Sequence, residues 1–544
     1  MTIERRKLRW NGWGLVDAPD VLGDRAEGVW TWMSRALGVS PLPSTPAKEL
    51  SDITLPPVLL DSHTLRKIES VLRAGRVTTD DYERAFHARG KSYLDLLHLR
   101  AGRLDTAPDA VVYPTSAEEV LALVRLAEAE RIALIPFGGG STVVGGVTAE
   151  PGKGHVAAVT VDTTLMNQVL EIDKESLIAC VQSGIYGPQL EEALQAEGVT
   201  LGHYPQSFEF STLGGWIAPR SAGQQSNKYG KAEHWVVATN LATPQGMWST
   251  ENFPGSAAGP QLTDLVVGSE GVLGIIADAV IRLHPAPEAK DYRGYVFMDF
   301  AAGVAATRDM MQAAVPTAMI RLSDAAETRS FRALYAGGAE PDAADQFCLM
   351  VVGLEGDRAT VDTALERSRA VIERHGGMEL GEGPGETWYR SRFATPYLRD
   401  PMMDRGLAVE TLETATRWSN IINLHEVTSR AIADAMEANP GAPGARGIVM
   451  AHISHSYTDG ASLYFMCTFV RDTAREVEQW LAIKRAASDA IVANGGTISH
   501  HHGVGTDHMP WIGSEKGPIS TAILKAVKDQ VDPTGILNPG KLIA

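Results

Sequence analysis

The feature that most constrains the fold is a glycine triplet at the end of an apolar run. Residues 132–137 are mostly apolar, and three consecutive glycines follow them. Glycine lets the backbone adopt positive φ and approach a bulky group closely. Successive N–H groups in such a turn point into one concavity that binds phosphate oxygens without a lysine. We therefore expect a buried strand that leads into an anion-binding loop, formed by Pro136, Phe137, Gly138, Gly139, Gly140, Ser141 and Thr142; an ordinary tight turn is the alternative.

The residues before this strand predict a helix. Ser116 and Glu119 have the spacing of a capping box. Val120, Leu123 and Val124 then recur with helical periodicity. A capped helix followed by a buried strand is the local context in which a phosphate-binding loop is expected.

Further clusters of small and hydroxyl-bearing residues follow between apolar segments. The first contains Gln206, Ser207, Phe208, Glu209, Phe210, Ser211, Thr212, Gly214 and Gly215, the second Pro219, Arg220, Ser221 and Ala222, and the third Gly268, Ser269, Glu270, Gly271, Val272, Leu273 and Gly274. Together with the glycine triplet, they could line one long cofactor that carries a polyphosphate.

In this order, the segments resemble the FAD-binding domain of the vanillyl-alcohol oxidase type family, although Leu213 interrupts the first cluster. The resemblance implies FAD, with its pyrophosphate at the glycine loop. Some members attach the flavin covalently through a histidine in this loop. Ser141 and Thr142 occupy that region here, so we expect non-covalent FAD.

The chain of 544 residues is long enough for about three to four structural units. We expect an N-terminal helical extension over residues 1–104 and a two-subdomain FAD-binding domain over residues 105–288. An α+β cap domain over residues 289–502 and a segment over residues 503–544 that returns to the FAD domain complete this α+β fold. Two successive strand–helix units after residue 289 predict a sheet covered by helices on one face.

Net charge and residue content limit the classes of partner that this chain can bind. A net charge of −17 argues against nucleic acid as a partner and against strong attraction of the whole surface to anionic lipid. Cys180, Cys348 and Cys467 show no paired spacing, and no run approaches the roughly 20 apolar residues of a membrane span. We expect a cytoplasmic homodimer with a small-molecule or lipid-like substrate. Peripheral membrane contact stays open, and exposed apolar surface beside a tunnel mouth would support it.

Three consecutive histidines, His500, His501 and His502, are candidates for proton transfer near neutral pH. If they lie on a strand, His500 and His502 share one face and His501 points away. A metal patch and a purely structural role are the alternatives. Where the flavin family has a metal site, it has histidines at positions that Ser456 and Leu463 occupy here, so we expect no metal.

The residues around these histidines resemble a narrower family, the alkyldihydroxyacetonephosphate synthases. The resemblance rests on residues 499–505 and 457–461, and extends to residues 10–14, 203–215, 320–322 and 397–400. It implies exchange of the acyl chain of acyl-dihydroxyacetone phosphate for a fatty alcohol through a covalent flavin adduct, as in ether-lipid synthesis. This exchange involves no net redox change.

The same resemblance implies roles for individual residues. Tyr457 would be the acid/base for a substrate C–H proton, Arg399 would bind a carboxylate or phosphate, and Arg321 would anchor the active-site wall. The three histidines would line the flavin and bind phosphate or transfer protons. From the residues alone, Arg399 also fits a surface charge network and Tyr457 a half-buried strand position.

Two departures keep other functions open. Residues 506–509, Thr-Asp-His-Met, stand where the synthases tend to carry a basic run, and residues 538–542 are more like the 2-hydroxy-acid dehydrogenases. An FAD-dependent oxidase or dehydrogenase of a hydroxy acid or other alcohol is therefore the second hypothesis. A non-catalytic flavoprotein is the third.

Overall fold

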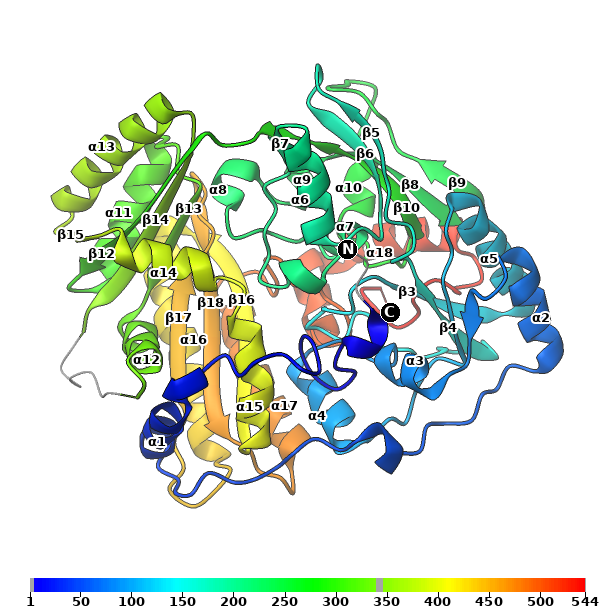
Figure 1. The fold of residues 1–544 in the computed structure, drawn as a ribbon, viewed down its shortest axis with the longest axis horizontal. Coiled ribbons are helices and arrows are strands. Elements are labelled where there is room, and N and C mark those ends of the chain that lie inside the picture. Colours follow the sequence, from blue (N-terminus) through cyan, green and yellow to red (C-terminus); the bar gives the residue numbers. More distant parts are fainter. Residues whose placement is uncertain (1–3, 339–345, 544) are drawn as a thin grey trace.

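The computed structural model describes residues 4–338 and 346–543, which form two lobes (Figure 1). One lobe contains two main sheets, and the other is organised around a single seven-stranded sheet. This mixture of helices and sheets, together with the similar solved structures reported below, confirms the predicted α+β class. The exact domain boundaries stay a prediction.

The first sheet carries the glycine loop. Its strands, in spatial order, are β1 (Val77–Thr78), β2 (Ala110–Val112), β4 (Ala157–Asp162) and β3 (Ile132–Phe137). The last three are parallel, and β3 has the bounds predicted from its apolar run. Helices α2 (Ser62–Val71) and α5 (Ala117–Glu130) complete this layer.

Only half of the predicted capping box forms at α5. Ser116 Oγ accepts the Glu119 N–H at 3.3 Å. The Glu119 carboxylate instead accepts the Thr115 N–H at 2.6 Å, which anchors the preceding residue. The helix therefore begins where the sequence predicts, with a different second hydrogen bond.

The second sheet is antiparallel, and α5 packs between it and the first sheet. Its strands are β5 (Val169–Asp173), β6 (Ile178–Gln182), β10 (Ile275–Arg282), β8 (Val236–Thr243) and β9 (Gly246–Ser249). The short strands β7 (Val199–Thr200) and β11 (His284–Pro285) pair separately. The helices of this region are α6 (Gly187–Ala196), α7 (Leu213–Ile217), α8 (Ser226–Tyr229), α9 (Ala232–Trp235) and α10 (Thr263–Val266).

The cap lobe has an antiparallel sheet whose two faces differ. Its strands are β15 (Met378–Gly381), β12 (Ala289–Phe297), β14 (Cys348–Gly356), β13 (Met319–Ser323), β17 (Ile448–Ile453), β18 (Gly460–Val470) and β16 (Leu407–Arg417). One face packs against α11 (Phe300–Gln312), α13 (Arg358–Arg374), α16 (Ile421–Ala438) and α17 (Glu476–Ala493). The other face turns toward the flavin lobe, beside α12 (Ala325–Tyr335), α14 (Gly383–Ser391) and α15 (Arg399–Asp404).

Strand β18 shows how the two faces are encoded. Leu463, Phe465 and Cys467 lie in the helix-covered core. The residues between them, Tyr464 and Met466, line a cavity between the lobes. Side chains alternate along a strand, so a single strand supplies both the core and the cavity wall.

The N-terminal segment packs on both lobes, and the C-terminal segment returns to the flavin lobe. Helix α1 (Ala26–Leu37) packs on the cap, and α3 (Asp81–Phe86) lies nearer the glycine loop. Helix α4 (Tyr93–Ala101) packs against the cap elements β16 and α17. After the kinked helix α18 (Met509–Val531), Leu537 pairs with Leu134 of β3, so residues near position 540 complete the first sheet. Within the described ranges, no helix combines the length and apolar character needed to cross a bilayer.

Candidate active site

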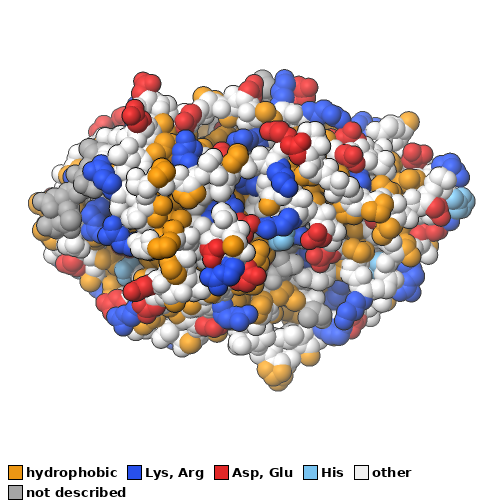
Figure 2. Space-filling model, turned by 90° about the horizontal axis from the view of Figure 1, so that it is seen from below, with side chains coloured by type: hydrophobic (Ala, Val, Ile, Leu, Met, Phe, Trp, Pro, Cys, Tyr) orange, Lys and Arg blue, Asp and Glu red, His pale blue; other side chains and the backbone are white. Residues whose placement is uncertain are grey.

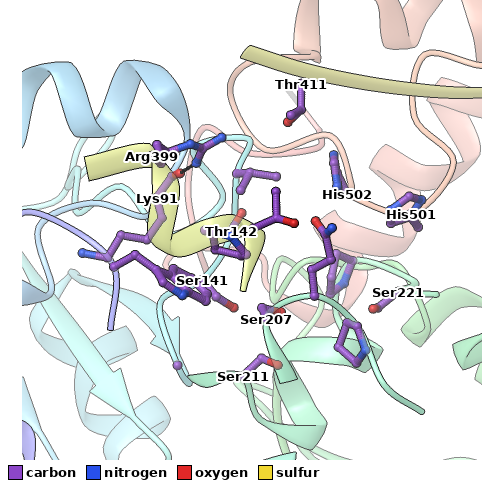
Figure 3. A pocket seen from close by; sticks show the side chains of 18 of the residues that line it. Lys91, Ser141, Thr142, Ser207, Ser211, Ser221, Arg399, Thr411, His501 and His502 are labelled. Carbon is purple, nitrogen blue, oxygen red and sulfur yellow. Dashed lines mark hydrogen bonds between the residues drawn. The ribbon is translucent and has the colours of Figure 1, made fainter. Parts of the chain in front are cut away.

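A cavity of about 390 Å³ is lined by residues of both lobes and of the N-terminal extension. The flavin lobe contributes the glycine loop and most of the predicted small-residue clusters. The cap contributes polar side chains from the inner face of its sheet and from the histidine loop. Figure 3 shows Arg399 and Lys91 on one side of this cavity and His501 and His502 on the other.

The glycine loop has the properties of an anion-binding nest. Within the part of the chain that is described, the backbone N–H groups of residues 138–142 have no protein acceptor. A Cβ at Gly139 would lie 1.7 Å from the Phe210 carbonyl oxygen, and one at Gly138 would lie 2.2 Å from Thr212 Oγ1. N–H groups without a protein acceptor at the wall of a cavity are available to a ligand, so an anionic group is the natural partner of this loop.

The other predicted cofactor residues divide into two groups. Those that line the cavity are Gln206, Ser207, Ser211, Thr212, Gly214, Gly215, Pro219, Ser221, Ala222, Glu270, Gly271 and Gly274, together with all seven residues of the glycine loop. Those that do not are Phe208, Glu209, Phe210, Arg220, Gly268, Ser269, Val272 and Leu273. The second group supports the wall: Phe208 stacks on Trp216, and Arg220 pairs with Glu233 at 3.4 Å.

Ser183 was not among the predicted residues, but its position fits a bound cofactor. It is buried, it lines the cavity, and its Oγ has no hydrogen-bond partner in the described chain. A buried hydroxyl without a partner marks a place where a ligand group is expected. The free amides of the glycine loop and this hydroxyl together fit a phosphate-bearing cofactor such as FAD.

Glu270 joins the flavin lobe to the C-terminal segment. Its carboxylate accepts the N–H groups of Val504 and Gly505 at 2.6 and 2.7 Å. Burial raises the pKa of Glu270 to about 7, although both hydrogen bonds oppose this shift. The cluster over residues 268–274 therefore also positions the loop that carries the three histidines.

The three histidines lie on a loop, so the strand alternation predicted for them is wrong. The buried carboxylate of Glu413 on β16 organises the loop: it accepts the N–H groups of His500, His501 and His502, the last at 2.8 Å, and the Ser499 hydroxyl at 2.7 Å. Convergence of these donors on one carboxylate curves the backbone, so neighbouring rings do not alternate. His500 Nδ1 and His501 Nδ1 are only 2.9 Å apart.

Burial lowers the pKa values of these imidazoles, which favours their neutral forms. The pKa values of His500 and His501 are lowered well below the ordinary histidine value, first by burial and then by nearby histidines and Lys231. Burial also lowers the pKa of His502. A neutral imidazole can both donate and accept a proton, so the cluster is suited to proton transfer.

The structure places Tyr457 behind the cavity wall and Tyr464 at its surface. Tyr457 precedes β18, and its hydroxyl lies 2.5 Å from His500 Nε2; neither residue lines the cavity. Tyr464 does line it, stacks on His452 with ring centroids 4.9 Å apart, and contacts the rings of His501 and His502. In this geometry Tyr457 contacts His500, whereas Tyr464 is the tyrosine that lines the cavity.

Arg399 lines the cavity and is held by backbone contact. Its Nη1 donates to the Lys91 carbonyl oxygen at 2.7 Å. No carboxylate of the described residues pairs with Arg399, whereas the neighbouring Asp400 accepts from Arg9 and from the Trp13 N–H at 3.1 and 2.9 Å. The charge network therefore involves Asp400, and the Arg399 guanidinium has donors left for a ligand.

Lys91 is a cavity residue that no pattern in the sequence singles out. It is buried beside Arg399, and its Nζ donates to the Trp10 carbonyl oxygen at 2.9 Å. Burial lowers its pKa to about 8, although Asp400 and Asp95 oppose the shift. The turn at residues 10–14 packs between the lobes: the Trp13 ring lies 5.6 Å from Phe210, and the Trp13 N–H donates to Asp400 of the cap.

Arg321 also lines the cavity but already has strong partners. It pairs with Glu327 at 3.0 Å and contacts both ring nitrogens of His452 at 3.1 Å. Burial alone would raise the pKa of Glu327, but Arg321 and His452 lower it to about 2. This network fixes the wall beneath Tyr464.

A second, apolar branch of the same cavity leads toward α1. Its residues come from the N-terminal extension and the cap, and include Val29, Trp30, Met33, Phe331, Leu334 and Met402. No charged side chain is among these six. An apolar branch continuous with an anion-binding loop suits a ligand with a hydrocarbon chain and a charged end.

His455, His500 and His501 are close enough to hold a metal ion, since one ring nitrogen from each lies within 4.8 Å of the others. His455 and His500 already use both ring nitrogens in contacts with protein atoms. The expectation that no metal binds here stays a prediction.

Comparisons with known proteins define the class first. Residues 108–250 match the FAD binding domain, and residues 286–542 match the C-terminal domain of FAD linked oxidases. A 4-ethylphenol oxidase from Gulosibacter chungangensis, 17% identical, shares the fold with a TM-score of 0.67 over 90% of this chain and 98% of its own. The chain is thus an FAD-dependent enzyme with the fold of the vanillyl-alcohol oxidase type.

The narrower family follows from full-length similarity. The alkyldihydroxyacetonephosphate synthase of Dictyostelium discoideum is 34% identical over 99% of this chain and 94% of its own length. A solved alkyldihydroxyacetonephosphate synthase, 31% identical, superposes with a TM-score of 0.84 over 99% of this chain and 100% of its own. The chain belongs to the alkyldihydroxyacetonephosphate synthase family.

Proposed function

We propose that this chain exchanges the acyl chain of an acyl-dihydroxyacetone phosphate for a fatty alcohol and releases a fatty acid. The observation that carries the proposal is one cavity in which an anion-binding glycine loop and a free guanidinium are continuous with an apolar branch. A hydroxy acid needs no such branch, whereas an acyl chain does. Family membership supports the same substrate class.

The amides of residues 138–142 would hold the FAD pyrophosphate, and Ser183 would hydrogen-bond another polar group of the cofactor. When bound, FAD supplies an electron-rich ring that can hold the dihydroxyacetone carbon during the exchange. The loop contains no histidine, cysteine or tyrosine, which supports non-covalent attachment. Its glycines are required because the segment over residues 210–212 packs directly against them.

The remaining roles follow from what each side chain can reach. Arg399 would bind the substrate phosphate with paired N–H donors, assisted by the cationic form of Lys91. Tyr464 would be the acid/base in contact with the substrate, because it is the phenol at the cavity surface beside His501 and His502. Arg321 would fix the wall through Glu327 and His452. Tyr457 and His500 would act from behind His501.

The proposal also covers the oligomeric state, contact with membranes and the cellular compartment. Peripheral contact with lipid at the apolar branch is part of the proposal, and Tyr335 at the end of α12, which is 45% exposed, would lie at such a contact. On the face seen in Figure 2, acidic and basic side chains are interspersed. Any binding of this face to lipid would therefore depend on a local apolar patch and not on the charge of the whole face. The homodimer expected from the sequence is part of the same proposal. Three unpaired thiols support a reducing compartment, the cytoplasm.

The test is anaerobic incubation of the FAD-loaded protein with acyl-dihydroxyacetone phosphate and hexadecanol. We expect stoichiometric release of fatty acid and formation of the alkyl product, without lasting loss of the flavin absorbance. Lasting flavin reduction by a simple hydroxy acid, with no alkyl product from the lipid substrates, would support the oxidase or dehydrogenase hypothesis instead.

A further inference from the structure

A second cleft lies beyond the histidine loop, and it is not part of the cavity described above. It is lined by Ala415, Thr416, Arg417, Ser419, Asn420, Tyr457, Asp459, Gly460, Ala461 and Gly495. Thr458 and Asp459 beside it are exposed, so the cleft is open to water. Tyr457 is the only one of these lining residues that contacts the three histidines through a hydrogen bond in the described structure.

A continuous chain of hydrogen bonds joins this cleft to the cavity. The Tyr457 hydroxyl lies 2.5 Å from His500 Nε2, and His500 Nδ1 lies 2.9 Å from His501 Nδ1. His501 lines the cavity, whereas Tyr457 lines the cleft. His500 touches both and lines neither, so it can serve only as the middle member.

We propose that Tyr457, His500 and His501 form a proton relay between the flavin cavity and the second cleft. The inference deepens the proposed function, on which it rests for its substrate. When His501 gives its Nε2 proton to a group in the cavity, His501 Nδ1 takes the proton from His500 Nδ1. His500 Nε2 then takes the Tyr457 hydroxyl proton, and the Tyr457 oxygen takes one from water in the cleft.

One inward transfer inverts the tautomers of both imidazoles, and one outward transfer restores them. The proposed reaction removes a proton from the substrate carbon at one stage and returns one at another. The relay is therefore reset after each turnover without ring rotation, and no net charge remains in the protein.

The surroundings of the relay favour such a neutral chain. Lys231 Nζ donates to the His500 carbonyl oxygen at 2.9 Å and pairs with Glu233 at 3.2 Å. Glu413 binds the loop backbone and lies 3.6 Å from His501 Nδ1. The other ionisable groups near these rings are Asp459 at the cleft, the imidazoles of His455 and His502, and the Tyr464 phenol beside His501. Burial, and after it the Lys231 ammonium, disfavour an imidazolium at His500, so protons would pass along the chain without a charged histidine accumulating.

The first test needs no substrate. Nitrogen NMR of the FAD-loaded protein with ¹⁵N-labelled histidine, compared with Tyr457→Phe, reports the tautomer of His500 and its hydrogen bond. We expect neutral His500 and His501, and a shift of the His500 Nε2 resonance when the hydroxyl is removed. An unshifted resonance, a doubly protonated His500, or one tightly bound metal ion per chain would overturn the relay whatever the enzyme catalyses.

The second test measures turnover with acyl-dihydroxyacetone phosphate and hexadecanol. A wild-type protein without activity would refute the proposed function, and the NMR result alone would then decide whether the relay exists. With an active wild type, we expect Tyr457→Phe to lower kcat roughly tenfold or more at unchanged KM. We also expect slower exchange of the substrate C–H proton with D₂O.

Rescue and a matched control separate a relay from a structural effect. Small buffer acids such as imidazole should restore part of the rate of Tyr457→Ala in proportion to their concentration, by entering the cleft. Ser419→Ala, which changes the same cleft without touching the chain of hydrogen bonds, should match wild type. A Tyr457→Phe variant with wild-type kcat and exchange rate would refute the relay.

Discussion

Replacement of Gly139 by alanine tests whether the glycine loop holds the cofactor. The added Cβ would lie 1.7 Å from the Phe210 carbonyl oxygen and 3.0 Å from the Ser211 Cα. An ordinary carbon–oxygen contact is about 3.5 Å, so the loop and the segment over residues 210–212 must separate by roughly 1.5–2 Å. Both partners are backbone, so rotation of a side chain cannot relieve the contact.

A displacement of this size removes hydrogen bonds from the loop amides to the pyrophosphate. Each such bond to a charged group contributes about 1.5–3 kcal/mol, so loss of two costs about 3–6 kcal/mol. The expected result is a Kd for FAD raised by a factor of about 100 to 10⁴. Overpacking should also lower the free energy of unfolding by about 1–3 kcal/mol.

The assay is a titration of the apoprotein with FAD, followed by the quenching of flavin fluorescence. Gly513→Ala in α18 is the matched control, because nothing lies within 4 Å of its added Cβ. The control should bind FAD like wild type. If Gly139→Ala also binds FAD within a factor of about three of wild type, the assignment of the pyrophosphate to this loop is wrong.

Four further predictions concern the site. Glu413→Gln puts an amide group opposite backbone N–H donors, so chemical denaturation should show a loss of about 2–3 kcal/mol, whereas exposed Glu386→Gln should show none. Tyr464→Phe should lower kcat for fatty-acid release by a factor of about 10² to 10⁴ with little change in KM; a wild-type kcat would remove it from catalysis. Arg399→Lys loses paired donors and should raise KM by a factor of about 10 to 100 while FAD affinity stays unchanged; an unchanged KM would contradict phosphate binding there. The raised pKa of Glu270 means that the folded apoprotein holds its proton more tightly than the unfolded chain, so about 3 kcal/mol of stability should be lost as pH rises from 4.5 to 7. Denaturation at several pH values should show a shallower loss in Glu270→Gln, and equal slopes would contradict this origin.

The parts of the site that are contiguous in sequence could be predicted from it. The strand β3 and the glycine loop follow each other directly, so composition and order were enough to place both. The geometry of the three histidines could not be predicted, because Glu413 lies 87 residues away from His500. The alternation considered for them assumed a strand, whereas hydrogen bonds to this one distant carboxylate hold the segment as a loop.

The sequence contains a signal for which of Tyr457 and Tyr464 lines the cavity. Leu463, Phe465 and Cys467 alternate with Tyr464 and Met466, and this period of two assigns Tyr464 to the face opposite the core. Tyr457 stood out only through resemblance. Lys91 had no comparable signal, because its place in the cavity depends on how the N-terminal extension crosses between the lobes.

The pairing of Leu537 with Leu134 has a consequence for biosynthesis. The Leu134 N–H donates to the Ile536 carbonyl oxygen at 2.8 Å, and the Asn538 side chain donates to the Gly146 and Glu270 carbonyl oxygens. The edge of β3 thus stays open until some 400 later residues have left the ribosome, for about 20–80 s at ordinary elongation rates. The nascent chain has to keep this open strand edge from pairing with other strands throughout that interval.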